Sequence, residues 1–344
     1  MTQMASSDKL RIAVAGAGFW AAYQIAGWLE LGEVEVCAIY NRTRAKAESL
    51  ASRFGIRAVY DDPQKMLLEA RPDALDIITS PDTHEELVGL AVACGVPVIC
   101  QKPMSTSLES AERMVEGARA AGVPFIVHEN WRWQRPIRQL QQLLASGMVG
   151  KPFRGRLEFN CSFPVFDNQP FLRELDRFII TDVGSHVLDV ARFLFGEFDS
   201  IYCRAQRIHG DIKGEDVATI VLARGDLTCT CELSYASRLE HERFPETYIR
   251  VEADAGALEL GPDYWVRATT EEGTHSKRYP PRRYSWVDPA YELVHSSIVD
   301  CHRDILAALR GERRAETDAE DNIKTVRLVF AAYESAQREE VIRL

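Results

Sequence analysis

Two groups of residues in this 344-residue chain could carry out acid–base chemistry. Lys102 follows the apolar run Val98-Ile99-Cys100, and Asp182 and His186 stand four residues apart, a spacing that places both on one face of a helix. A histidine titrates near neutrality and suits a general base, whereas a lysine stabilises negative charge on oxygen. The residues by themselves fit plainer roles equally well: an exposed lysine, a helix-capping aspartate and a buried, hydrogen-bonded histidine.

The segment Gly16-Ala17-Gly18-Phe19-Trp20-Ala21 has the spacing of a dinucleotide-binding loop, with alanine as its third small residue. A strand is expected before it and a helix after it, which is the context that this pattern requires. Gly16 would permit the tight turn, and Gly18 would let a pyrophosphate approach the helix N-terminus, with Phe19 and Trp20 beside it. A glycine turn without a ligand is the alternative, and the context favours the cofactor.

The second expected strand ends Ile39-Tyr40-Asn41-Arg42-Thr43 and contains no acid that would select NAD. Asn41 can bond a ribose hydroxyl of either cofactor. Arg42 can pair with a 2′-phosphate, stack on adenine or simply be solvated. The sequence therefore predicts NAD or NADP, with Arg42 leaning slightly to NADP.

Strand and helix patterns alternate over the first 130 residues, which predicts a parallel sheet covered on both faces. Mostly apolar runs mark strands that are buried on both sides, at 10–15, 34–40, 74–79, 96–100 and 123–127. We assign residues 1–129 to a doubly wound Rossmann domain.

The pattern changes in residues 130–344, which we assign to a second α/β domain for substrate binding and oligomerisation. A helix over 134–146 precedes a strand over 153–163, and strand-like runs joined by short turns occupy 200–279. Such runs are typical of a mostly antiparallel sheet. Two helices, over 291–310 and 317–336, close the chain.

Polar residues follow the apolar strands of the first domain at the edge where a doubly wound sheet binds its ligands. Ser80-Pro81-Asp82-Thr83-His84 follows one strand, Gln101-Lys102-Pro103 the next, and His128-Glu129-Asn130 the last. This placement would hold Lys102 close to a bound nicotinamide.

Together these elements resemble the glucose–fructose oxidoreductase, inositol dehydrogenase and rhizopine-catabolism (Gfo/Idh/MocA) family along nearly the whole chain. The resemblance rests on the glycine loop, Ser80-Pro81 with His84, Lys102-Pro103, the Asp182-x-Gly-x-His186 element and the closing helix. It implies that Lys102, Asp182 and His186 are catalytic, and that Ser80, Pro81, His84, Gln101, Lys102 and Asn130 join the glycine loop in binding the cofactor. It also implies a large open sheet in the second domain, which often mediates homodimers or homotetramers.

Two positions depart from the family pattern. Gln101 replaces a glutamate, so Lys102 loses a counter-charge, although an amide can still bond the nicotinamide ribose. Arg177-Phe178 replaces a glycine pair ahead of the Asp182 element, which would reshape the floor of the substrate pocket. The substrate therefore cannot be copied from another member.

These residue types suit oxidation of a carbinol, in which a hydroxyl proton and a hydride leave together. His186 would remove the proton, Lys102 would stabilise the alkoxide, and Asp182 would hold the substrate or the imidazole. Residues that could line a polyol pocket, each of which could equally be structural, are Asn130, Arg132, Trp133, Asn160 and Arg177.

We therefore expect an NAD(P)-dependent oxidoreductase for a sugar or cyclitol, for example a pentose such as D-apiose oxidised to its lactone. Two alternatives stay open: a non-catalytic dinucleotide sensor, and an NAD-dependent glycosidase of the same fold. Retention of the three catalytic residues argues against the sensor. Net formation of reduced nicotinamide from a free sugar would separate the dehydrogenase from both.

The composition of the chain argues against several other kinds of partner. The net charge of -10, with no basic stripe, argues against nucleic acid, and no stretch approaches the roughly twenty apolar residues that span a membrane. Cys229 and Cys231 would share a face of a strand, but no further ligands accompany them, and Asp182 with His186 lacks a third ligand. We expect reduced thiols, no metal and a cytoplasmic location.

Overall fold

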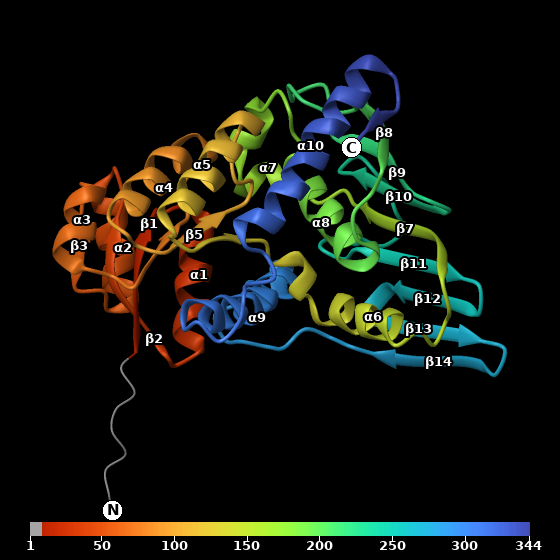
Figure 1. The fold of residues 1–344 in the computed structure, drawn as a ribbon, viewed down its shortest axis with the longest axis horizontal. Coiled ribbons are helices and arrows are strands. Elements are labelled where there is room, and N and C mark those ends of the chain that lie inside the picture. The colour runs from red at the N-terminus through yellow and green to blue at the C-terminus, as the bar shows by residue number, and fades with distance from the viewer. Residues whose placement is uncertain (1–8) are drawn as a thin grey trace, which may run out of the picture. The chain divides into compact units, whose positions relative to one another are not determined.

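The computed structural model describes residues 9–344, whose contacts divide into two compact units (Figure 1). The first unit extends to His128 and also includes Ile298–Ile323, and the second comprises Glu129–Ser297 and Lys324–Leu344. The sequence placed the boundary between residues 129 and 130 and did not foresee that 298–323 group with the first unit. A helical pattern reports which face is apolar but not which unit that face packs against.

The first unit contains the predicted parallel sheet of the Rossmann type. Its six strands are ordered β3-β2-β1-β4-β5-β6, and every pair within it is parallel. Its elements are β1 (Leu10–Ala15), α1 (Phe19–Glu30), β2 (Val34–Tyr40), α2 (Arg44–Phe54), β3 (Ala58–Tyr60), α3 (Pro63–Ala70), β4 (Ala74–Ile77), a 3-10 turn (Pro81–Thr83), α4 (His84–Ala93), β5 (Val98–Gln101), α5 (Leu108–Ala121) and β6 (Phe125–His128).

Helix ends in this unit follow local capping chemistry. Asp62 accepts a hydrogen bond from the backbone N–H of Lys65 at the start of α3, and Ser107 accepts one from Ser110 at the start of α5. Gly122 ends α5 in the left-handed conformation (φ 65°), which glycine adopts readily. These caps fix where each helix begins or ends relative to the strand ends.

A buried acid on β4 contacts helix α1. Asp76 is fully buried, and Trp28 donates its indole N–H to Asp76 Oδ2 over 2.8 Å. The Trp28 ring stacks on His302 of α9 (Glu292–Leu309), with centroids 3.7 Å apart. Burial raises the pKa of Asp76 to about 7 and lowers the pKa of His302 well below its usual value. Both side chains therefore disfavour their charged forms.

We expect Asp76→Asn to stabilise the protein increasingly as the pH rises. An aspartate titrates near pH 4 in an unfolded chain and Asp76 near 7 in the folded one, so the free energy of unfolding falls as pH rises through this window. Asparagine keeps an acceptor for Trp28 and has no such proton to lose. Relative to wild type, its free energy of unfolding should gain about 2–3 kcal/mol between pH 5 and pH 8. Urea unfolding at both pH values measures this, and a pH-independent difference would contradict it.

The second unit contains a nine-stranded sheet ordered β14-β13-β12-β11-β7-β10-β9-β8-β15, antiparallel except for the pair β7–β10. This confirms the predicted mostly antiparallel sheet. Its strands are β7 (Pro152–Asn160), β8 (Ser200–Gln206), β9 (Val217–Arg224), β10 (Leu227–Ser234), β11 (Tyr248–Ala253), β12 (Gly256–Gly261), β13 (Trp265–Thr270), β14 (Gly273–Arg278) and β15 (Ile342–Arg343). The helices here are α6 (Arg135–Ala145), α7 (Val165–Asn168), α8 (Val183–Phe195), the first part of α9 and most of α10 (Ala319–Arg338), with 3-10 turns at Trp131–Trp133, Pro170–Glu174, Pro262–Tyr264 and Pro289–Tyr291.

The two faces of this sheet differ in chemistry. Helix α8 packs against β7 and β10, and α6 packs against β12 and β13 (Figure 1). On β7, Leu157 and Phe159 are buried on the side that the helices cover, while Arg154 and Arg156 alternate with them and are exposed. A side chain at Gly155 would meet the Phe195 ring at 2.6 Å, so α8 lies closely on the strand there. The opposite face is uncovered within the unit along β7 and β11, where its side chains are polar: Glu158 and Glu252 are half-buried and Arg250 is exposed.

Candidate active site

The glycine loop between β1 and α1 is built around Gly16. Its φ is +121°, and a Cβ there would lie 2.4 Å from the carbonyl oxygen of Ile78, so only glycine fits. Around Gly18, in contrast, a Cβ would meet nothing within 4 Å. The loop is therefore pressed onto the chain that follows β4, while Gly18 faces open space.

The start of α1 suits a phosphate. Gly18 is the N-cap and brings no capping side chain, and the first turn of the helix contains no acid. Phe19, Trp20 and Tyr23 form a cluster of edge-to-face rings with centroids 5.2–6.3 Å apart. A helix N-terminus of this composition favours an anion, so these residues fit the pyrophosphate of a dinucleotide.

The two glycines should respond differently to alanine. We expect Gly16→Ala to lower the free energy of unfolding by about 2 kcal/mol or more, because it meets backbone and a disfavoured φ. Gly18→Ala should leave stability within about 0.5 kcal/mol but weaken dinucleotide binding on the order of tenfold. Urea unfolding and fluorescence titration with NAD and NADP measure the two effects. Unchanged cofactor affinity in Gly18→Ala would contradict the assignment of the loop.

Asn41 and Arg42 follow β2. The Asn41 side chain accepts a hydrogen bond from the Ala17 N–H (3.1 Å) and donates one to the Thr43 carbonyl (2.9 Å), so it braces the glycine loop. Arg42 is exposed. Sequence reasoning did not anticipate the bracing contact, which adds to the predicted ribose role of Asn41.

Ser80, Pro81 and His84 lie where β4 leads into α4. Ser80 is exposed, Pro81 begins a short 3-10 turn, and His84 is fully buried. The His84 ring nitrogens lie 3.1 Å from the Met104 carbonyl and 3.2 Å from the Thr79 carbonyl. Burial lowers the pKa of His84, and a neutral ring can donate to one of these oxygens. The ring thus positions the segment that carries Ser80.

Gln101 is the last residue of β5, and Lys102 follows it. The Gln101 side-chain oxygen accepts a hydrogen bond from the Lys102 backbone N–H over 2.8 Å, and the Lys102-Pro103 peptide is cis. Lys102 is half-buried, at the carboxyl end of a strand that pairs on both sides, with β4 and β6. It belongs to the first unit, whereas Asp182 and His186 belong to the second.

His186 lies on the first turns of α8 and is only 5% exposed. Its Nδ1 is 2.5 Å from Oε1 of Glu129, which directly follows β6 and is 1% exposed. The same Oε1 accepts the backbone N–H of Trp131 over 3.1 Å. The Trp131 ring stacks on the imidazole, with centroids 4.3 Å apart and planes 18° apart. Sequence reasoning placed Glu129 at the ligand-binding edge but gave it no role.

Asp182 is the N-cap of α8 but makes no capping hydrogen bond with its side chain. The Tyr235 hydroxyl lies 3.5 Å from Asp182 Oδ2 and can donate to it. Burial, followed by the charge of Asp182, raises the pKa of Tyr235 well above its usual value, so the phenol stays protonated. A half-buried carboxylate that stands at the start of a helix without capping it suits a role in binding rather than in helix stability.

Several residues predicted to line the substrate pocket make internal contacts. Arg132 is 5% exposed and forms a two-pronged ion pair with Asp189, at 2.7 and 2.6 Å. Asn130 donates to the Val294 carbonyl and to Ser297 Oγ.

The other three predicted pocket residues differ in exposure. Trp133 is 7% exposed, with the Arg138 guanidinium 4.1 Å above its ring. Arg177 is exposed and lies over the Tyr333 ring, and Asn160 is half-buried at the end of β7. Of the five residues, Arg132 and Asn130 thus form hydrogen bonds within the second unit. Any contact that they make with a substrate would be in addition to those hydrogen bonds.

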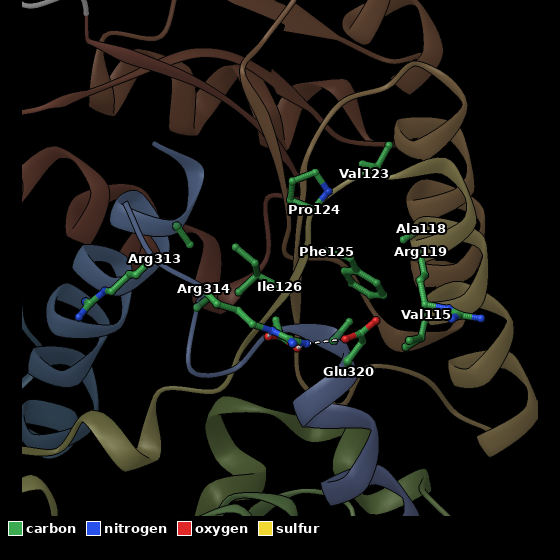
Figure 2. Close-up of a pocket in the computed structure, with 14 residues that line it drawn as sticks. Val115, Ala118, Arg119, Val123, Pro124, Phe125, Ile126, Arg313, Arg314 and Glu320 are labelled. Atoms are coloured by element: carbon green, nitrogen blue, oxygen red, sulfur yellow. Dashed lines mark hydrogen bonds and ion pairs between the residues drawn. The ribbon is translucent and has the colours of Figure 1, made fainter. Parts of the chain in front are cut away.

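Figure 2 shows a pocket of the first unit that contains none of the predicted site residues. Its floor is apolar and includes Phe125 and Ile126. Its three arginines are already paired: Arg119 with Glu116 at 2.7 Å, Arg313 with Asp304 at 2.8 Å, and Arg314 with Asp318 and Glu320. These pairs leave the pocket without unmatched charge for an anionic ligand.

Residues 9–344 contain no group of three or more His, Cys, Asp or Glu side chains arranged to hold a metal ion. The eight cysteines all lie within residues 9–344 and form no disulfide there, and Cys229 and Cys231 are both fully buried on β10. In the same residues, no helix has both the length and the apolar character needed to cross a membrane.

Comparisons with known proteins agree with this architecture. Residues 10–129 match the model of an oxidoreductase family with an NAD-binding Rossmann fold, and residues 137–259 match the GFO/IDH/MocA C-terminal domain. The chain is 37% identical to a D-apiose dehydrogenase of Paraburkholderia graminis, over 96% of this chain and 89% of that one. It is also 37% identical to a D-apiose dehydrogenase of Rhizobium rhizogenes, over 95% of each.

A solved oxidoreductase from Agrobacterium radiobacter, in complex with NAD+, L-tartaric acid and magnesium, superposes with a TM-score of 0.96. It is 37% identical, and the match covers 97% of this chain and 98% of that one. The glycine loop, the strand order and the whole-length similarity agree, and this chain belongs to the GFO/IDH/MocA family of NAD-binding oxidoreductases.

Proposed function

We propose that this protein is an NAD(P)-dependent dehydrogenase that oxidises a carbinol of a sugar, with Lys102, Asp182 and His186 as catalytic residues. The observation that carries the proposal is the imidazole of His186, whose Nδ1 is held by the Glu129 carboxylate. In an imidazole bonded in this way, Nδ1 contacts the carboxylate and Nε2 can take part in proton transfer. The family binds NAD, whose nicotinamide can accept the hydride while the base takes the proton.

The chemistry follows from the three side chains. A bound nicotinamide supplies the hydride acceptor. His186 takes the substrate hydroxyl proton, and the positive charge of Lys102 stabilises the oxygen as it loses that proton. Asp182 accepts hydrogen bonds from neighbouring hydroxyls and so orients the sugar. Loss of the proton and the hydride converts C–OH to C=O, which at an anomeric carbon yields a lactone.

The substrate proposal rests on the relatives. Two D-apiose dehydrogenases are 37% identical to this chain over at least 95% of its length, so D-apiose is the first sugar to test. Gln101 and Arg177-Phe178, which depart from the family pattern, are reasons to include other pentoses and cyclitols.

A spectrophotometric screen tests the function. Aldoses including D-apiose, cyclitols and sugar acids are mixed with NAD or NADP and enzyme, and absorbance of the reduced nicotinamide is followed. We expect net reduction with a free pentose. Hydrolysis of glycosides without net reduction would instead indicate the glycosidase, and cofactor binding without turnover of any sugar would indicate the sensor.

Cofactor choice should depend on Arg42, which is exposed after β2. We expect Arg42→Ala to weaken NADP binding by about 2 kcal/mol, the scale of a charge-assisted hydrogen bond, and to leave NAD nearly unchanged. Titration calorimetry with both cofactors measures this. Equal losses for NAD and NADP would indicate stacking on adenine, and no loss would indicate a solvated side chain.

We also propose that the protein is a homodimer or homotetramer that uses the uncovered face of the nine-stranded sheet. That face carries side chains of both signs, with Arg156 paired to Glu158 and Glu232, and Arg250 beside Glu252. A surface that carries both charges along neighbouring strands can pair with a rotated copy of itself.

A further inference from the structure

We propose that Glu129 is a positioning residue for the reaction: it holds His186 in the tautomer that carries its proton on Nδ1, so that Nε2 is the proton acceptor. The inference rests on the proposed function for its kinetic part. Its structural part, the tautomer, can be measured without a substrate.

The hydrogen bonds at Glu129 Oε1 determine the tautomer. A backbone N–H can only donate, so Oε1 accepts from Trp131 over 3.1 Å. A carboxylate oxygen has a second lone pair with which it can accept another hydrogen bond, and Nδ1 of His186 lies 2.5 Å from it. Nδ1 therefore carries the proton, and the lone pair of the neutral ring is on Nε2.

The other two acids near His186, Asp189 and Asp182, have partners of their own. Asp189, three residues further along α8, is matched by Arg132 at 2.6 Å and lies 3.9 Å from Arg192. Asp182 precedes the helix, and Tyr235, which follows β10, can donate to it. The Glu129 carboxylate contacts the ring directly, and it stabilises the imidazolium that forms when Nε2 takes a proton.

Packing fixes the ring as well as the proton. Trp131 stacks on the imidazole and donates its indole N–H to Thr247 over 2.9 Å, so the stacking surface is itself held in place. Glu129, Trp131 and His186 are all nine-tenths or more buried. Little room remains for the ring to turn over and exchange its nitrogens.

The tautomer is measured by long-range ¹H–¹⁵N spectra of the full-length protein with ¹⁵N-labelled histidine. The His186 signals are those that vanish in His186→Asn. We expect a protonated Nδ1 and an unprotonated Nε2 in the wild type, the same pattern in Glu129→Gln, which keeps an acceptor oxygen, and a mixture of tautomers in Glu129→Ala. A wild-type ring protonated on Nε2 overturns the proposal.

Kinetics on the same variants test the positioning role. We expect kcat to fall about tenfold in Glu129→Gln and about a hundredfold in Glu129→Ala, with KM within about threefold of wild type. The acidic limb of kcat/KM should move to lower pH in Glu129→Gln, because the negative charge that favours imidazolium is gone. A residue needed only for folding would not move this limb or be partly rescued by glutamine.

Asp216→Asn is the matched control. Asp216 is a buried carboxylate of the same unit that also accepts from a histidine, His209, and from two backbone N–H groups. We expect it to leave kcat and the pH profile unchanged. Wild-type kcat and acidic limb in both Glu129 variants overturn the proposal. If the wild type oxidises no sugar, the proposed function fails, while the spectra still decide the tautomer.

Discussion

Replacing His186 by asparagine is expected to lower kcat by about two orders of magnitude or more and to remove the acidic limb of the kcat/KM profile. In the wild type, kcat/KM for oxidation should fall at low pH, because only a neutral imidazole can accept the hydroxyl proton. Asparagine has no group that titrates in this range. Steady-state kinetics between pH 5 and pH 9 measure both effects.

His209→Asn serves as the control for this result. His209 is a half-exposed histidine of the same unit, paired with the buried Asp216, and has no place in the proposed chemistry. It should retain wild-type kinetics. If the acidic limb survives unchanged in the residual activity of His186→Asn, the base is another group, and Asp182 becomes the first candidate.

Lys102→Ala is expected to reduce kcat by a similar factor, about a hundredfold or more, while the affinity for the dinucleotide changes little. The positive charge is needed as the substrate oxygen loses its proton, whereas the cofactor is held mainly by the glycine loop. Lys65→Ala, which removes an exposed lysine from α3 of the same unit, is the control and should behave as wild type. Turnover, together with fluorescence titration of the cofactor, separates the two effects.

A loss of cofactor affinity equal to the loss of kcat would reassign Lys102 to cofactor binding. Near-wild-type turnover in Lys102→Ala would remove it from the reaction altogether.

The parts of the fold that local chemistry determines could be predicted from the sequence. The mostly apolar runs at β1 and β2 gave those strands their observed bounds, because a strand buried on both faces is rich in apolar residues. The polar residues within these runs, Arg11 and Glu35, are half-buried and exposed. The strand β3 was not predicted: it has three residues, all half-buried, and too little length for a periodic signal. Gly16 was identified by its spacing, and its φ of +121° agrees with the tight turn expected there.

Site residues were harder to predict where their partners are distant in sequence. Glu129 and His186 are 57 residues apart, and so are Arg132 and Asp189. Nothing in the local pattern tells a buried acid that contacts an imidazole from one that neutralises an arginine. Residue type therefore suggested that Arg132 could line a pocket, whereas the folded unit uses its guanidinium in a buried ion pair.

The most direct test of the proposed reaction follows the hydride itself. A pentose that the screen identifies is prepared with deuterium on the carbon to be oxidised and incubated with enzyme and NAD or NADP. Mass spectrometry then locates the label. We predict deuterium in the reduced nicotinamide, with one reduced cofactor formed for each sugar oxidised. Deuterium that stays in the sugar, with no reduced nicotinamide accumulating, would contradict the account.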